Sequence, residues 1–153
     1  MKTEKQKMLA GELYRPDDEL GAEQAAAKAW MARYNAALAL PVAERHALLR
    51  ERLAHVGKDA VIRPPFHCDY GYNIRLGDGV FLNFNCVILD VVEVTIGDRT
   101  QIGPAVQIYA ADHAMPKPAA PGSNSAAPCG SAAMSGSAAA RSCCRASPSA
   151  TAQ

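Results

Sequence analysis

The chain has 153 residues, a net charge of +1 and 49% hydrophobic residues, which is the size and composition of one ordinary globular domain. The small net charge gives no reason to expect nucleic acid or an anionic membrane as a partner, and no apolar run approaches the roughly 18 residues that cross a bilayer. The first residues have mixed charge and no apolar signal-peptide core, so we expect a cytoplasmic protein.

Residues 1–57 have the pattern of short amphipathic helices. The segment "TEKQKMLAGELY" offers Thr3 as an N-cap, and "PDDELGAEQAAAKAWMARYNAALAL" offers Asp17 or Asp18. A third helix is predicted for "PVAERHALLRERLAHVG", which begins with proline and ends at Gly57. Its apolar stripe is Leu49, Leu53 and Val56. Three short helices bury little surface alone, so we expect them to pack on a larger unit.

Residues 58–113 repeat every six residues. Aliphatic side chains recur at Leu76, Leu82 and Ile88 and, after a two-residue insertion within "DVVEVT", at Ile96, Ile102 and Ile108. A second apolar series stands four places later, at Val80, Cys86, Val92 and Val106. A hexapeptide period is typical of a parallel β-helix, in which each short strand is one side of a triangular coil. An antiparallel sheet with fortuitous spacing is the alternative, but two runs in phase with glycine disfavour it.

The five cysteines do not indicate a metal site. Their number is odd and none forms a C-x-x-C pair, so neither a zinc site nor a disulfide framework is predicted. Cys68 and Cys86 stand among apolar residues, and we interpret both as small buried side chains. We therefore expect no metal.

Residues 114–153 lack Leu, Ile, Val, Phe, Tyr, Trp, Asp and Glu. Such a segment cannot bury enough apolar area to offset about 1–2 kcal/mol of backbone ordering entropy per residue, so we expect it to be disordered. The coils would then be truncated and lack a cap. Because a neighbouring reading frame of the tail restores isoleucine–glycine hexads, we hypothesise a frameshift near Ala114. A natural Ala/Ser-rich linker is the alternative, and the nucleotide sequence of the gene decides between them.

Three long segments carry a resemblance to a known family. "KMLAGELYRPDDEL", "PPFHCDYGYNIRLGDGVFLNFNCVILD" and "VTIGDRTQIGPAVQIYAADH" resemble the maltose and galactoside O-acetyltransferases among the hexapeptide-repeat acyltransferases. The resemblance covers residues 3–113 and stops at Ala114. It implies a left-handed parallel β-helix, preceded by a small helical region, that transfers acetyl from acetyl-CoA to a sugar hydroxyl. It also implies homotrimers with active sites between adjacent prisms, if the coils present suffice to form them.

The resemblance assigns roles to five residues. His113, in "ADH", matches the family's catalytic histidine, whose neutral imidazole would remove the hydroxyl proton. Asp69 and Asn83 match positions that line the acceptor pocket, and Asn85 and Asp17 are further candidates for it. Turn formation is the alternative for Asp69, Asn83 and Asn85, and helix capping is the alternative for Asp17. No residue that binds acetyl-CoA is assigned, because the family's later coils, which hold the donor, have no counterpart here.

Two other readings are possible. The chain could be an inactive, truncated member of the same family, and we expect the 153-residue chain to show no turnover where a frame-corrected version does. A β-helical carbonic anhydrase would need several histidines around zinc, whereas only His67 and His113 lie in the coil region. Maltose, glucose, galactosides and chitin-derived sugars are all candidate acceptors.

Overall fold

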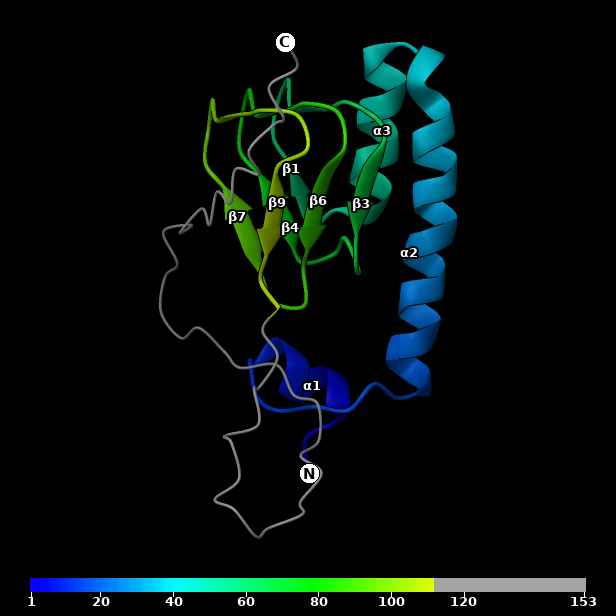
Figure 1. Cartoon of the computed structure of the whole chain (residues 1–153), viewed down its shortest axis with the longest axis vertical. Helices are drawn as coiled ribbons and strands as arrows, with labels where there is room; N and C mark the ends of the chain where they lie inside the picture. Colours follow the sequence, from blue (N-terminus) through cyan, green and yellow to red (C-terminus); the bar gives the residue numbers. More distant parts are fainter. Residues whose placement is uncertain (112–153) are drawn as a thin grey trace, which may run out of the picture.

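The computed structural model describes residues 1–111. Three α-helices and one 3-10 helix come first, and nine short strands follow. The helices are α1 (Glu4–Leu9), α2 (Asp18–Ala36), η1 (Ala37–Ala39) and α3 (Val42–Arg52). Figure 1 shows α2 and α3 side by side along one flank of the strands, with α1 beneath them. The predicted tail and His113 lie outside the described residues.

Two of the helices begin where the sequence predicts. Thr3 caps α1 in a capping box with Gln6, each side chain accepting a hydrogen bond from the other's backbone N–H. Asp17 caps α2, where its Oδ1 accepts a hydrogen bond of 3.0 Å from the N–H of Leu20. The Asp17 side chain therefore fixes the start of α2 through a local contact.

The end of the third helix was predicted wrongly. The helix α3 ends at Arg52, Leu53 is extended, and Val56 belongs to the first strand rather than to a helical stripe. Leu53 and Val56 fit a helical period as well as the β-helix, and the contacts of the buried Val56 with the coil interior decide the outcome. The coils thus begin at His55.

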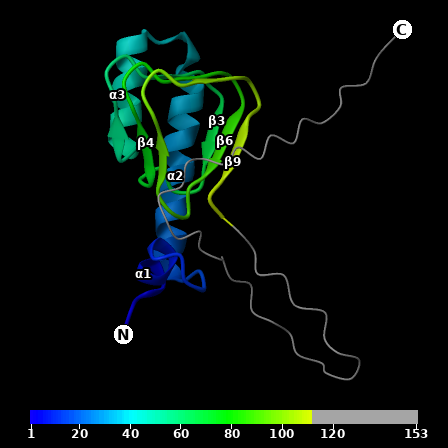
Figure 2. The same ribbon diagram turned by 90° about the vertical axis from the view of Figure 1, so that its left-hand side faces the viewer.

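The strands form three parallel sheets, which are the three sides of the coil. They are β1 (His55–Val56), β2 (Val61–Ile62), β3 (Phe66–Cys68), β4 (Ile74–Leu76), β5 (Phe81–Leu82), β6 (Cys86–Leu89), β7 (Val94–Ile96), β8 (Gln101–Ile102) and β9 (Gln107–Tyr109). The sheet orders are β1-β4-β7, β2-β5-β8 and β3-β6-β9, so each strand pairs with its equivalent in the next coil. Figure 2 shows these turns stacked beside α2. The predicted left-handed parallel β-helix is confirmed.

The register explains the hexads and extends them by one coil. Val56 pairs with Leu76 and Leu76 with Ile96, so one coil takes 20 residues. Ile62 and Cys68 continue the six-residue series from Val56, so the hexads named in the sequence analysis are preceded by a further set in the first coil. Three hexads make 18 residues, and a two-residue insertion at the same corner of each coil supplies the remainder. The insertion predicted within "DVVEVT" is therefore one member of a regular series.

The insertion also corrects one predicted core position. Val80 and Cys86 are buried as expected, but the next interior position is Val94, and Val92 is only partly buried. Val92 instead packs against a second apolar cluster, whose buried members are Met8, Leu20, Tyr70 and Val91. Residues at the insertions thus form an apolar surface against which α1 and the start of α2 pack.

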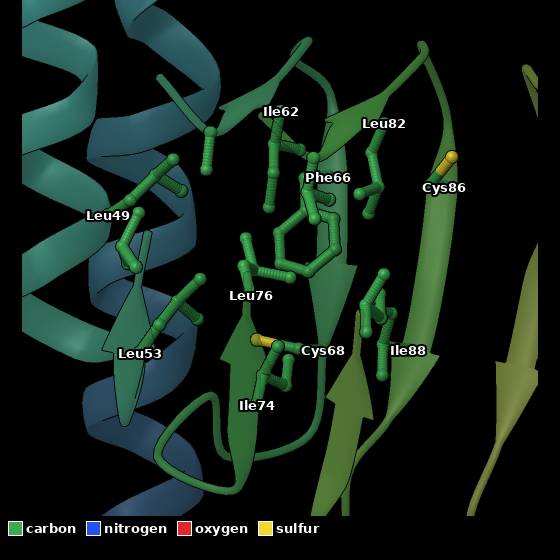
Figure 3. Close-up of a cluster of buried hydrophobic side chains, with 14 of the residues drawn as sticks. Leu49, Leu53, Ile62, Phe66, Cys68, Ile74, Leu76, Leu82, Cys86 and Ile88 are labelled. Atoms are coloured by element: carbon green, nitrogen blue, oxygen red, sulfur yellow. The ribbon is translucent and has the colours of Figure 1, made fainter. Parts of the chain in front are cut away.

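The main core fills the inside of the coils. Figure 3 shows Ile62, Phe66, Leu76, Leu82 and Ile88 pointing into the space that the strands enclose. Each of these side chains is buried, and Trp30, Tyr34 and Leu49 from the helices extend the same cluster. Within residues 1–111, no helix is both long and apolar enough to span a membrane.

Candidate functional site

Asp69 is the candidate pocket residue with the clearest setting. It follows β3 directly and is half-buried, and this burial raises the pKa of its carboxyl group above the usual value. Its backbone N–H donates to Asp90, but its carboxylate has no hydrogen-bond partner among residues 1–111. A half-buried carboxylate with free acceptor capacity is suited to bind hydroxyl groups.

The loop that carries Asp69 is held by a buried carboxylate that the sequence analysis did not single out. Asp90 is fully buried, and its two oxygens accept hydrogen bonds from four backbone N–H groups of residues 69–73. Burial raises the pKa of Asp90 to about 6, although these bonds favour the ionised form. The signal in the sequence was an aspartate between apolar residues, in "VILDVV".

Asn83 and Asn85 occupy the corner between β5 and β6. The side-chain oxygen of Asn83 accepts a hydrogen bond of 2.9 Å from the N–H of Phe84, and Asn83 is partly buried. Asn85 is exposed and has φ of 60°, and Ala105, one coil later, has φ of 58°. Both asparagines therefore have a role in the turn, while the amide nitrogen of Asn83 makes no hydrogen bond to another described residue.

Asp17 and Asp69 are each close in sequence to a member of the second apolar cluster. Asp17 caps α2, and Leu20 in the first turn of that helix packs with Tyr70, the neighbour of Asp69. Ala111, the last described residue, packs against the same cluster. The described chain therefore ends against the cluster that contains Leu20 and Tyr70, two positions before His113, which itself lies outside the described residues.

The structure separates Asp69 from the asparagines within one chain. Asp69 follows the carboxyl end of β3, whereas Asn83 and Asn85 precede the amino end of β6. Because β3 and β6 are adjacent and parallel, the two groups lie at opposite ends of one sheet.

The two coil cysteines are buried and free, as predicted. Burial raises the pKa of both the Cys68 and the Cys86 thiols, so neither is poised as a nucleophile. In the described part of the chain, no group of three or more His, Cys, Asp or Glu side chains is placed to hold a metal ion.

Comparison with known proteins gives a consistent result. Residues 7–57 match the maltose acetyltransferase hexapeptide capping motif. Over 113 residues the chain is 60% identical to nodulation protein L of Rhizobium meliloti (strain 1021), an alignment that covers 73% of this chain and 62% of the relative. The chain thus spans about three fifths of the length of two curated relatives, 62% and 60% for two nodulation L proteins.

Two solved structures share the fold. A maltose O-acetyltransferase from Clostridium difficile 630 superposes with a TM-score of 0.71 at 39% identity, over 73% of this chain and 60% of that one. A hexapeptide-repeat acetyltransferase from Vibrio cholerae, solved with acetyl coenzyme A, gives a TM-score of 0.66 at 40% identity, over 75% and 62%. Residues 1–111 are therefore similar in sequence and in fold to hexapeptide-repeat acetyltransferases, among them a maltose O-acetyltransferase.

Proposed function

We propose that the coils and N-terminal helices form the acceptor side of a sugar O-acetyltransferase that uses acetyl-CoA as donor. The observation that carries the proposal is the half-buried carboxylate of Asp69, which has no partner among the described residues. It stands in a fold shared with a maltose O-acetyltransferase. A neighbouring structure that contains acetyl coenzyme A supports the choice of donor.

His113 is the proposed general base. Its imidazole removes the proton of a sugar hydroxyl while the hydroxyl oxygen bonds to the carbonyl carbon of the thioester. The carbon–sulfur bond then breaks, and the proton passes to the sulfur of coenzyme A. General-base catalysis of this kind contributes about 10²–10⁴-fold to the rate.

The remaining predicted residues are assigned to acceptor binding. Asp69 and Asp17 approach the acceptor from the corner between β3 and β4, where Leu20 near the start of α2 packs with Tyr70 of the Asp69 loop. Asn83 and Asn85 lie at the opposite end of the same sheet within one chain. A site between adjacent subunits can use both ends, and for this reason the proposal includes a homotrimer. It also includes a cytoplasmic location, the compartment expected from the sequence.

Release of coenzyme A in the presence of sugars tests this function. The 153-residue chain is compared with a version whose reading frame is restored after Ala114, using maltose, glucose, galactosides and chitin-derived sugars. A chromogenic reagent follows the thiol, with the signal of the protein's own cysteines subtracted. We expect turnover by the restored version and none by the 153-residue chain, because the resemblance places donor binding in later coils.

A histidine pair provides the matched control. His113→Ala in the restored version should lower the rate by about 10²–10⁴-fold. His67→Ala should leave the rate unchanged, because His67 is an exposed residue of β3. If the restored version folds as a β-helix and acetylates no sugar, the proposed function is wrong.

A further inference from the structure

The loop of residues 69–73 is fixed by the buried side chain of Asp90, which follows β6 in the next coil. Oδ1 of Asp90 accepts hydrogen bonds from the N–H groups of Asp69 and Tyr70, at 3.0 and 2.9 Å. Oδ2 accepts from the N–H groups of Gly71 and Asn73, at 2.6 and 3.3 Å. The side-chain amide of Asn73 donates to the backbone oxygen of Asp90 at 2.7 Å. One carboxylate therefore holds the backbone of nearly the whole loop.

The same loop is also fixed from the side of the helices. The Arg52 guanidinium donates to the backbone oxygen of Tyr70 and, at 3.0 Å, to that of Glu23. The hydroxyl of Tyr72 donates to the Glu23 carboxylate at 2.6 Å. Gly71 has φ of +83°, and a β-carbon there would lie 2.7 Å from Cγ of Arg52. Glycine is thus needed both for the turn and for the close approach of Arg52.

In this arrangement the side-chain carboxylate of Asp69 is available to bind a ligand. Asp69 uses its backbone N–H to bond Asp90, while its carboxylate has no hydrogen-bond partner among the described residues. A binding group gains most when its backbone is already ordered, because less conformational entropy is lost on binding. Asp90 supplies that order without facing solvent, since it is fully buried.

We propose that Asp90 is a positioning residue for the acceptor: it holds the loop of residues 69–73 so that the Asp69 carboxylate is aimed at a sugar hydroxyl. This inference rests on the proposed function. It differs from a purely structural role in one respect. A structural role predicts a less stable protein, whereas a positioning role also predicts weaker binding of the acceptor and unchanged binding of the donor.

Two substitutions at Asp90 separate these roles. Asp90→Asn keeps the shape and one acceptor oxygen but turns an NH2 group toward two backbone N–H donors. Asp90→Ala removes both acceptors, so Asp90→Asn is the variant to rely on if Asp90→Ala does not fold. Asp98→Asn is the matched control, because Asp98 Oδ1 accepts a backbone hydrogen bond of 2.8 Å from Asp78 at another corner of the coil.

Amide hydrogen exchange of the 153-residue chain tests the loop directly. Exchange at residues 69–73 should accelerate in Asp90→Asn and stay unchanged in Asp98→Asn. In the frame-restored enzyme, Asp90→Asn should raise the KM for the sugar by about tenfold or more, because the displaced Asp69 carboxylate loses its charged hydrogen bond to the sugar hydroxyl. The KM for acetyl-CoA should not change.

Three outcomes overturn the inference. If amide exchange at residues 69–73 is the same in Asp90→Asn as in the parent, the Asp90 carboxylate does not order the loop. A loosened loop with an unchanged sugar KM, or with both KM values raised together, assigns Asp90 a structural role alone. A parent enzyme that acetylates no sugar defeats the proposed function itself, and this failure is recognised because it precedes any substitution at Asp90.

Discussion

Replacing Gly57 by alanine would place a methyl group against the backbone of the next coil. A β-carbon at Gly57 would lie 2.5 Å from the backbone nitrogen of Asp78 and closer still to the carbonyl group of Gly77. Non-bonded heavy atoms pack at about 3.5 Å, so the two coils would have to separate by about 1 Å at this corner. The obstacle is main chain on both sides, which cannot rotate away as a side chain can.

The loss of stability that Gly57→Ala would cause follows from the hydrogen bonds that join the two coils at this corner. Gly57 N–H donates to the oxygen of Leu76 at 2.8 Å, Lys58 N–H to the Asp78 carboxylate at 2.7 Å, and Gly79 N–H to the oxygen of Lys58 at 2.7 Å. A separation of about 1 Å would stretch all three beyond hydrogen-bonding distance. At about 1 kcal/mol each, Gly57→Ala should lower the free energy of unfolding by about 3 kcal/mol, within the few kcal/mol typical of overpacking.

The structure offers a matched control one repeat further along. Gly97 holds the position that Gly57 and Gly77 hold in the earlier coils, yet a β-carbon there would meet no described atom within 4 Å. Gly97→Ala should therefore change stability by less than about 0.5 kcal/mol. Urea unfolding followed by the fluorescence of Trp30, the single buried tryptophan, measures both variants. Equal unfolding midpoints for the two variants would refute the stacking argument.

Three further predictions concern side chains around the coils. Asn35→Ala should cost about 2 kcal/mol in urea unfolding, because the Asn35 side chain bonds both the N–H and the C=O of Phe66, at 2.8 and 3.0 Å; a loss below about 0.5 kcal/mol would contradict this. The pKa of Asp90 is raised to about 6, above the value of about 3.9 in an unfolded chain, so the folded state retains a proton that the unfolded state releases. The unfolding free energy should accordingly fall by up to about 3 kcal/mol as the pH rises from 4 to 7, and Asp90→Asn should lack this component; parallel pH profiles would show the reasoning to be wrong. In a variant whose cysteines after residue 111 are replaced by serine, Cys68 and Cys86 should react with a chromogenic disulfide only after unfolding, since both thiols are buried and their pKa values are raised; rapid reaction in native buffer would disprove it.

The six-residue period determined the fold because it is a local property of the chain. An aliphatic residue at every sixth place, in phase with glycine, specifies a triangular coil. The observed register pairs Leu76 with Ile96 and Ile88 with Ile108, as three hexads and the two-residue insertion require. The start of α2 was predictable to within one residue for the same reason, since an N-cap acts over three residues; the structure selects Asp17 from the two candidates, Asp17 and Asp18.

Other features depended on contacts between distant parts of the chain. Val56 fits a helix in sequence, and its burial in the coil interior decides that it begins the first strand. Val94 rather than Val92 is buried in the main core, because the two-residue insertion shifts the six-residue period. Val92 packs against the second apolar cluster instead.

Of the candidate site, too, one part was predictable from the sequence and another part depended on the tertiary structure. The residue types of Asp69, Asn83 and Asp17 suggested hydroxyl recognition, and the resemblance to a family gave their positions. That a buried Asp90 orders the Asp69 loop became visible only in three dimensions. Its donors lie 17 to 21 residues earlier in the chain, one coil away, and only the stacking of coils brings a carboxylate and four backbone N–H groups together.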